Sequence, residues 1–172
     1  LLTQCRDCNF NAVRVWGGGY YPHDWFFDIC DELGLIVFQD MMFACSFVPD
    51  TKEFLDNIAI EIEQNLKRIR HHASLVIISG NNEVECCIPE SEAVKQNYYH
   101  IFEGMIPDIV KKVCPEIPYV SSSPSTVGHF VDPNNENYGD SHYWEVWHGG
   151  RPFTEYRNHY FRYLSEFGFQ SF

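Results

Sequence analysis

The sequence predicts an α/β fold, namely an incomplete (β/α)₈ (TIM) barrel that contains about strands 2 to 7 and lacks the first and last strands. Short apolar segments alternate along the chain with segments of helical periodicity, as in a parallel sheet that is buried on both faces. Nearly every apolar segment ends in polar or aromatic residues, and barrel enzymes carry their chemistry at the carboxyl ends of the strands. About six strands are expected, which is too few to close a barrel of eight.

The first predicted strand and helix lie within residues 11–34. Residues 11–16 alternate as a short strand does, and the glycines at 17–19 end it. The segment 22–34 has apolar residues at helical spacing and closes with Gly34, a residue type that commonly ends helices. The expected apolar face of this helix consists of Trp25, Phe26, Ile29, Cys30 and Leu33.

Two further strands flank a longer helix. Residues 35–38 and 75–78 are continuous apolar segments of strand length, and the helix between them is expected from about 51 to 72. Its outer face is charged, which leaves one stripe for the core. The stripe consists of Phe54, Ile58, Ile62, Leu66 and Ile69.

The remaining elements are less regular. A helical region is expected within 91–114 and a strand at 119–123, followed by a loop at 124–137 that is rich in Pro, Asn and Gly. Residues 137–144 and 162–170 each predict a short strand with a polar end. The strand ends gather the following residues: Arg14, Trp16, Gln39, Asp40, Asn82, Glu83, 121–123, His142, Tyr143, Trp144 and Glu166.

Composition excludes several classes of function. The chain has 172 residues, of which 45% are hydrophobic, and a formal net charge of −12, so a nucleic-acid or anionic membrane partner is not expected. No apolar run has the roughly 18–20 residues of a membrane span. The segment lacks a G-x-G-x-x-G or Walker loop, and we expect no cofactor. The sequence does not indicate an oligomeric state.

The cysteines indicate a reducing compartment. Their number, seven, is odd, and only Cys5 and Cys8 form a C-x-x-C, so buried free thiols are favoured over disulfides or a metal site. Cys86 and Cys87 are adjacent and do not easily complete a tetrahedral site. The pair His71–His72 sits at a helix end and is interpreted as solvated surface, so no metal is expected. A cytoplasmic location follows from these observations.

Two glutamates offer a specific chemistry. Glu83 and Glu166 each end a predicted strand, and on a barrel they would face each other across its mouth. Paired carboxylates serve to hydrolyse glycosidic bonds, one as acid and the other as nucleophile or base. Arg14 is expected to pair with the nucleophile and Asn82 to bond a ring hydroxyl, while Trp16 and Trp144 offer apolar faces to a sugar.

Three blocks of sequence resemble the β-mannosidases of glycoside hydrolase family 2. They contain "RVWGGG" and "QDMMFAC" in the first block, "GNNE" in the second and "SEFGFQS" in the third. The resemblance runs from about residue 9 to 172 and covers nearly the whole chain. It implies a retaining enzyme that hydrolyses terminal non-reducing β-D-mannose by double displacement.

The resemblance also implies roles for individual residues. Glu83 matches the general acid/base, Glu166 the nucleophile, and Asn82 the amide that contacts the 2-hydroxyl. Substrate-binding positions are expected at Arg14, Trp16, Asp40, Asn82, His142, Tyr143 and Trp144. Lysosomal or secreted locations occur in the family. Residues 1–172 correspond to part of a catalytic barrel domain, without the flanking β-sandwich domains, and the rest of the enzyme is the expected partner.

Three alternatives stay open. The first is another family 2 specificity, namely a galactosidase, glucuronidase or glucosaminidase. The second is an inactive remnant that binds sugar without hydrolysis. The third is a His-based metal enzyme, which has little support because His71 and His72 are adjacent on a helix end and do not share a face. Glu85 is a rival to Glu83 as the acid, but strand geometry points Glu85 elsewhere.

Overall fold

The structure is a computed structural model of the chain, and it describes residues 1–89, 91–126 and 130–169. The chain divides into two compact units, Leu1–Ser122 and Ser123–Phe172, which are described in turn. Each unit contains a parallel β-sheet. The predicted α/β class is therefore confirmed.

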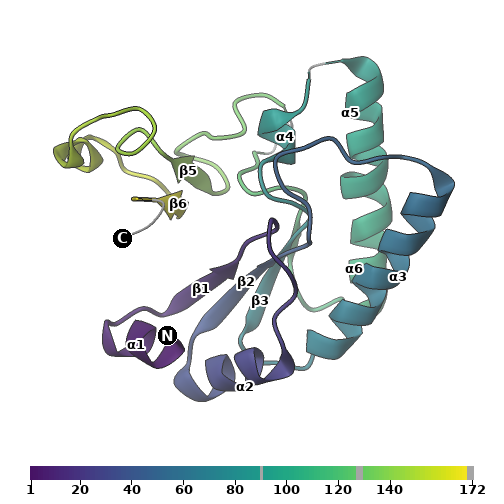
Figure 1. The fold of residues 1–172 in the computed structure, drawn as a ribbon, viewed down its shortest axis with the longest axis horizontal. Helices are drawn as coiled ribbons and strands as arrows, with labels where there is room; N and C mark the ends of the chain where they lie inside the picture. Colours follow the sequence, from purple (N-terminus) through teal and green to yellow (C-terminus); the bar gives the residue numbers. More distant parts are fainter. Residues whose placement is uncertain (90, 127–129, 170–172) are drawn as a thin grey trace. The chain divides into compact units, whose positions relative to one another are not determined.

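The first unit is built on a four-stranded parallel sheet whose strands follow one another in chain order (Figure 1). The strands are β1 (Ala12–Val15), β2 (Ile36–Asp40), β3 (Leu75–Ser79) and β4 (Tyr119–Val120). All four correspond to predicted strands. Because they are parallel, their carboxyl ends lie at one end of the sheet.

Two strands differ in length from the prediction. β2 extends through Gln39 and Asp40, which pair with Ile78 and Ser79 of β3. β4 stops before the serines at 121–123, because Asn81 bonds the first two of them: its Nδ2 donates to the Ser121 carbonyl, and its Oδ1 accepts from the Ser122 hydroxyl.

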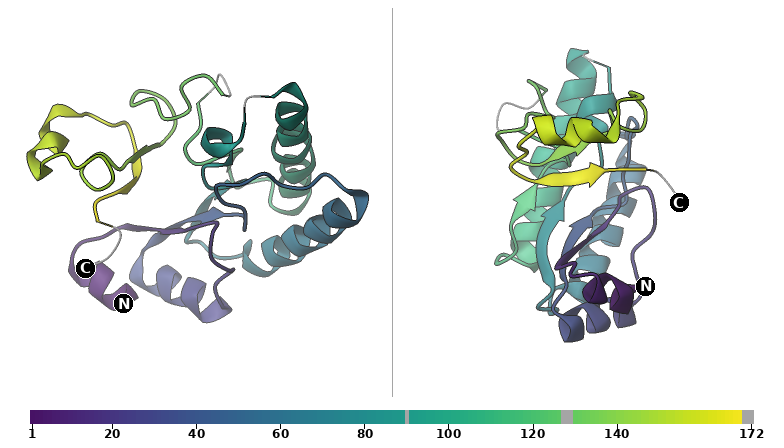
Figure 2. Two further views of the ribbon diagram at one scale, coloured as in Figure 1. Left: turned by 45° about the horizontal axis from the view of Figure 1, so that its top comes forward. Right: turned by 90° about the vertical axis from the view of Figure 1, so that its left-hand side faces the viewer.

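Helix α1 precedes the first strand, and the other helices of the first unit connect successive strands. The elements are α1 (Leu2–Asp7), α2 (Asp24–Leu33), α3 (Lys52–Ile69), α4 (Val84–Cys87), α5 (Glu92–Tyr98), the π-helical η1 (Tyr99–Met105) and α6 (Ile106–Val113). The last three form one continuous helical run between β3 and β4 (Figure 2), which matches the helical region expected within 91–114. None of the helices in the described ranges is long and apolar enough to cross a membrane.

Local sequence explains the ends of α2 and α3. Gly34 ends α2 in the left-handed conformation, with φ of 70°, which glycine adopts without a steric penalty. The Thr51 hydroxyl accepts a hydrogen bond from the Phe54 amide and so begins α3. Both boundaries lie within a few residues of the positions predicted from the sequence.

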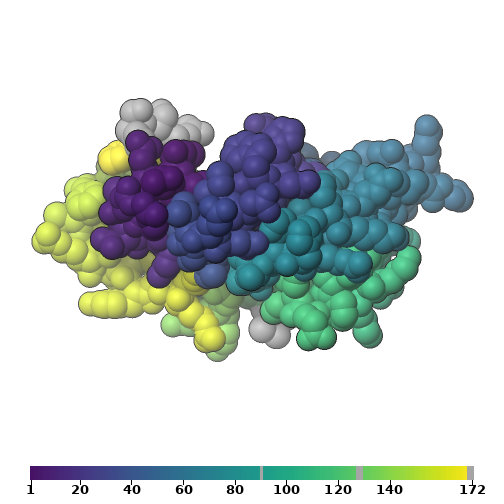
Figure 3. All heavy atoms as spheres, turned by 90° about the horizontal axis from the view of Figure 1, so that it is seen from below, coloured from purple at the N-terminus to yellow at the C-terminus, as the bar shows by residue number. Residues whose placement is uncertain are grey.

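The core of the first unit lies between the sheet and its helices. Four of the five residues predicted for the stripe of α3 are buried, while Phe54 is half-buried. On α2 the buried residues are Phe27 and Cys30, whereas Trp25 is 59% exposed. Phe27, which the prediction left out, packs in a cluster with Leu35 and Val37, and the predicted Phe26 and Leu33 are partly buried against that cluster. The prediction is therefore wrong for Trp25 and misses Phe27. Figure 3 shows α1, α2 and α3 side by side on one face, and adjacent pairs of them are in contact.

His72 corrects the interpretation of His71–His72 as solvated surface. The His72 side chain is 5% exposed, and its Nδ1 lies 2.8 Å from Oδ2 of Asp31. The Ser74 amide donates to the other oxygen of Asp31 at 2.7 Å. Desolvation acts to raise the pKa of Asp31, but the hydrogen bonds from Ser74 and His72 outweigh it, and the net shift is downward.

The second unit contains a two-stranded parallel sheet and a 3₁₀ helix. Its elements are β5 (Ser141–Tyr143), η2 (Phe153–Asn158) and β6 (Leu164–Phe167). The two strands confirm the predictions at 137–144 and 162–170 in shortened form, although Gln170 lies outside the described residues. Glu166 lies within β6 and not after it, since it pairs with His142 of β5.

Candidate active site

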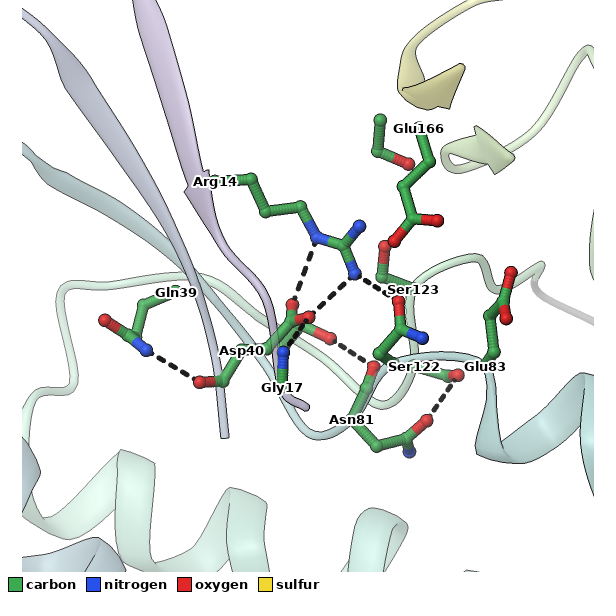
Figure 4. Close-up of polar contacts among 12 residues, drawn as sticks. Arg14, Gly17, Gln39, Asp40, Asn81, Glu83, Ser122, Ser123 and Glu166 are labelled. Carbon is green, nitrogen blue, oxygen red and sulfur yellow. Dashed lines mark hydrogen bonds and ion pairs between the residues drawn. The ribbon is translucent and has the colours of Figure 1, made fainter. Parts of the chain in front are cut away.

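Arg14 organises the carboxyl end of the first sheet (Figure 4). Its Nη2 donates to Oδ2 of Asp40 at 2.7 Å and to Oδ1 of Asn82 at 2.8 Å. Its guanidinium also lies 5.4 Å from the centre of the Phe38 ring. The side chains of Arg14 and Asp40 are 11% and 0% exposed, so each charge depends on the other for compensation. Three predicted site residues from β1, β2 and the β3 end therefore form one network.

The two asparagines after β3 make different kinds of contact. Asn81 is fully buried and fixes the backbone, since its Oδ1 accepts from the Val84 amide at the start of α4. Asn82 directs its amide toward the network, accepting from Arg14 and donating from Nδ2 to Sγ of Cys45 at 3.4 Å. A backbone bridge between Ala44 and Asn82 fixes this turn. The amide of Asn82 is thereby held in one orientation.

Glu83 directly follows this turn and precedes α4. Its φ is 57°, a left-handed conformation that costs a non-glycine residue about 1–3 kcal/mol and is concentrated at functional sites. The carboxylate is half-buried and accepts from the Cys45 thiol at 3.5 Å. Desolvation, and then the Glu83 charge, raise the pKa of Cys45 to about 11.

Glu85 faces away from the strand end, as predicted. It is 3% exposed within α4, and the Tyr98 hydroxyl donates to its Oε2 at 3.1 Å. Burial, and then the Glu85 charge, raise the pKa of Tyr98 above its ordinary value of 10.0. Because Glu85 is enclosed and engaged with Tyr98, Glu83 is the better placed acid.

Two glycines of the sequence motifs are required by close packing. A Cβ on Gly17 would lie 2.4 Å from the Phe43 carbonyl oxygen, and the Gly17 amide donates to Oδ2 of Asp40 at 3.0 Å. A Cβ on Gly80 would lie 2.5 Å from the Ser121 carbonyl oxygen. Both backbones must approach their neighbours closely, which only glycine permits.

Glu166 in the second unit is held by two side chains of the β5 region. The Trp144 Nε1–H donates to its Oε2 at 3.2 Å, and Nδ1 of His142 lies 3.4 Å from the same oxygen. His142 is 4% exposed, and its backbone amide donates to Oδ1 of Asn134 at 2.7 Å. The carboxylate is thereby fixed in one orientation, as a nucleophile requires.

Asp140 is a residue of this site that the sequence analysis did not single out. Its Oδ2 accepts from the hydroxyls of Ser123 and Ser165, both at 2.5 Å. Ser123 also lies 3.1 Å from Nε2 of His142, so Asp140 supports the histidine that faces Glu166. The signal available in the sequence was an acidic residue within the predicted strand at 137–144, directly before the observed β5.

The other predicted residues lie in different surroundings. Tyr143 is buried, its hydroxyl lies 2.9 Å from Nε2 of His159, and its ring packs against the Phe161 ring. Trp16 is 49% exposed, and the backbone of Gly18 packs against its ring. A role in sugar binding stays a prediction for both residues.

The arrangement provides two carboxylates with distinct surroundings. Glu83 lies beside a thiol and next to an amide that a guanidinium orients. Glu166 lies beside an indole N–H and an imidazole. Acid/base and nucleophilic roles need such separate environments. Arg14 contacts Asp40 and Asn82, and its expected pairing with Glu166 concerns both units and stays a prediction.

No model of a known protein family matches the chain. Individual proteins do. The chain is 37% identical to "Beta-mannosidase B" of Thermothelomyces thermophilus over 93% of this chain and 20% of that protein. It is 36% identical to a "Probable beta-mannosidase" of Caenorhabditis elegans over 100% of this chain and 21% of that protein. It is 33% identical to the "Beta-mannosidase" of Bos taurus over 99% of this chain and 21% of that protein. The chain thus spans about one fifth of the length of these relatives.

Solved structures agree with these matches. A β-D-mannosidase from Dictyoglomus thermophilum matches 97% of this chain, and 21% of its own, with a TM-score of 0.87 and 38% identity. A β-glucuronidase of Bacteroides uniformis matches 91% of this chain, and 19% of its own, with a TM-score of 0.68 and 19% identity. At that identity the second match shows a shared fold alone.

Proposed function

This chain belongs to the β-mannosidase family as a segment of about one fifth of its members' length, and from that premise we propose that it supplies both catalytic carboxylates of a retaining exo-β-mannosidase. The substrate is a glycoside or oligosaccharide with a terminal non-reducing β-D-mannose. The observation that carries the proposal is the identity of 33–38% to proteins named β-mannosidase over nearly the whole chain.

The contacts of the two glutamates support different catalytic roles, with Glu83 as the acid/base and Glu166 as the nucleophile. Glu83 is half-buried after the end of a parallel strand. It follows Asn82, whose amide is held by Arg14 and is the proposed contact for the 2-hydroxyl of the sugar. Glu166 is held by Trp144 and His142. In the proposed first step Glu166 attacks the anomeric carbon while Glu83 gives its proton to the leaving oxygen. Glu83 then takes a proton from water, which releases mannose with net retention.

A (β/α)₈ barrel is the proposed setting for both residues. Parallel sheets are normally covered on both faces, yet Ile36 of β2 and Val76 of β3 are 43% and 37% exposed. Such residues are expected to be covered when the barrel is closed by strands outside this segment. Within a closed barrel a retaining mechanism requires carboxyl groups about 5–5.5 Å apart, whereas inversion requires about 6.5–9.5 Å.

The substrate specificity can be tested with the full-length protein that contains this segment. A panel of p-nitrophenyl β-glycosides is hydrolysed and the initial rates are compared. We expect kcat/KM for the β-mannoside to exceed that for the galactoside, glucuronide and glucosaminide. A preference for one of the latter three favours another β-glycosidase, and mannose binding without hydrolysis of any glycoside favours a sugar-binding remnant.

The roles of the glutamates can be tested by substitution. Glu166→Gln removes the nucleophile, so turnover should be abolished. Glu83→Ala should slow substrates with poor leaving groups most, and azide should partly restore the rate by replacing water in the second step. Glu145→Gln, at an exposed position of the same unit, is the matched control and should retain activity. Equal losses with good and poor leaving groups in Glu83→Ala would contradict its role as the acid.

A further inference from the structure

Two thiols and the proposed acid lie together beside β3. Cys45 Sγ, Cys87 Sγ and a carboxylate oxygen of Glu83 all lie within 4.8 Å of one another. The Cys45 thiol is 3.5 Å from Oε2 of Glu83. Cys86, the immediate neighbour of Cys87, is not part of this cluster. All three groups belong to the first unit.

The spacing matches a tetrahedral zinc site. With a Zn–S bond of about 2.3 Å and a Zn–O bond of about 2.1 Å, tetrahedral geometry places sulfur and oxygen about 3.6 Å apart. The observed distance between Cys45 Sγ and Glu83 Oε2 is 3.5 Å. Two thiolates and one carboxylate also suit zinc better than harder cations such as magnesium. A fourth ligand could be supplied by solvent.

The backbone holds these ligands in place. Cys45 and Glu83 both have left-handed conformations, with φ of 55° and 57°. The Cys45 amide donates to the Asn82 carbonyl at 2.9 Å, so the two loops are joined directly. Asn82 Nδ2 donates to the Cys45 sulfur, which favours a metal-bound thiolate. Cys45 and Cys87 are exposed, which corrects the expectation of buried thiols for these two residues, so an ion can enter from solvent.

We propose that Cys45, Cys87 and Glu83 form a binding site for Zn²⁺ that inhibits the enzyme by occupying its acid/base. Binding releases the two thiol protons, and zinc then bonds two sulfurs and the Glu83 carboxylate. The inhibition rests on the proposed function, since it requires Glu83 to be the acid. Binding of the metal itself does not depend on the proposed function.

Binding is tested with Cd²⁺, which reports thiolate ligation by an ultraviolet charge-transfer band. The full-length protein, reduced and free of metal, is titrated with cadmium. We expect one ion per chain to produce the band, and Cys45→Ser and Cys87→Ser to weaken binding about tenfold or more. Glu83→Gln should also weaken it. Cys86→Ser is the matched control and should titrate as the unsubstituted protein does.

Inhibition is tested with Zn²⁺ and a β-mannoside. The ratio of rates with and without zinc is measured for each variant, and Cys87→Ser should require about tenfold more zinc for half inhibition. A charge-transfer band that both cysteine variants retain at full strength overturns the site. If the protein does not hydrolyse glycosides, the proposed function fails while the cadmium titration still decides the metal site.

Discussion

Arg14 connects three segments of the chain through one guanidinium. It contacts Asp40 of β2 and Asn82 after β3, while itself belonging to β1. The Asp40 carboxylate has no solvent exposure, and removal of one partner from a buried ion pair leaves the other charge uncompensated. The network is therefore a condition for stability as well as a candidate for substrate binding.

Arg14→Ala should destabilise the full-length protein strongly. We expect a loss of about 3–5 kcal/mol in the free energy of unfolding of the unit that contains it, because Asp40 stays buried without its partner. Urea denaturation followed by fluorescence measures the loss. Arg6→Ala removes an exposed arginine that pairs with Asp7 and should change stability by less than about 0.5 kcal/mol. Similar losses in the two variants would contradict this account of Arg14.

Trp144 is expected to position Glu166, the proposed nucleophile, through its indole N–H. Trp144→Phe keeps an aromatic ring but removes the donor that lies 3.2 Å from Glu166. A hydrogen bond to a charged group contributes about 1.5–3 kcal/mol, so kcat should fall by roughly 10- to 100-fold with a smaller change in KM. Trp147→Phe is the control, since Trp147 packs against Phe169. An unchanged kcat in Trp144→Phe would show that the contact has no catalytic role.

At the scale of elements, Asp31 joins α2 to the segment that leads into β3. One carboxylate oxygen contacts His72 and the other accepts from the Ser74 amide. The pKa of Asp31 is lower in the folded state than its ordinary value of 3.8. Folding therefore favours the ionised form, and the stabilisation is present above about pH 4 and is lost as the pH falls through the folded pKa.

Asp31→Asn should reduce stability at neutral pH and flatten the acid limb of the stability curve below about pH 4. The midpoint of thermal unfolding, measured from pH 7 down to the onset of acid denaturation, tests this. Asp28→Asn, at an exposed position of the same helix, should leave the curve unchanged. If Asp31→Asn and the unsubstituted protein differ by a constant amount at every pH, the hydrogen bonds to Asp31 do not account for its lowered pKa.

At the scale of the whole molecule, the first unit leaves apolar strand surface uncovered. β1 and β4 are the edges of its sheet, and Ile36 and Val76 are partly exposed on the inner strands. Edge strands and open apolar faces lead to aggregation unless they are paired or covered. We therefore expect the segment to depend on further chain for stability.

Residues 1–172 expressed alone should aggregate or fold poorly and show no mannosidase activity. Gel filtration and a β-mannoside assay test this, with the full-length protein as the reference. Soluble, monomeric and active material from the segment alone would refute the prediction.

Much of the fold could be predicted from sequence because strands and helices depend on local periodicity. The apolar segments at 35–38 and 75–78 gave two strands, and Gly34 ended a helix as expected. The stripe of α3 was found because its residues repeat at helical spacing. The burial of Phe27 was not predicted, since Phe26 and Phe27 are equally apolar and packing alone decides which of them is fully buried.

The sequence by itself determined the order of strands and helices, the polar strand ends and two glutamates suited to glycosidic chemistry. Tertiary structure decided which side chains meet: Arg14 with Asp40, Cys45 with Cys87, and Asp31 with His72. These pairs are separated by many residues, and their contacts depend on the register between strands and on the conformation of the turns that follow. Local periodicity reports the burial of single residues and carries no information about such distant partners.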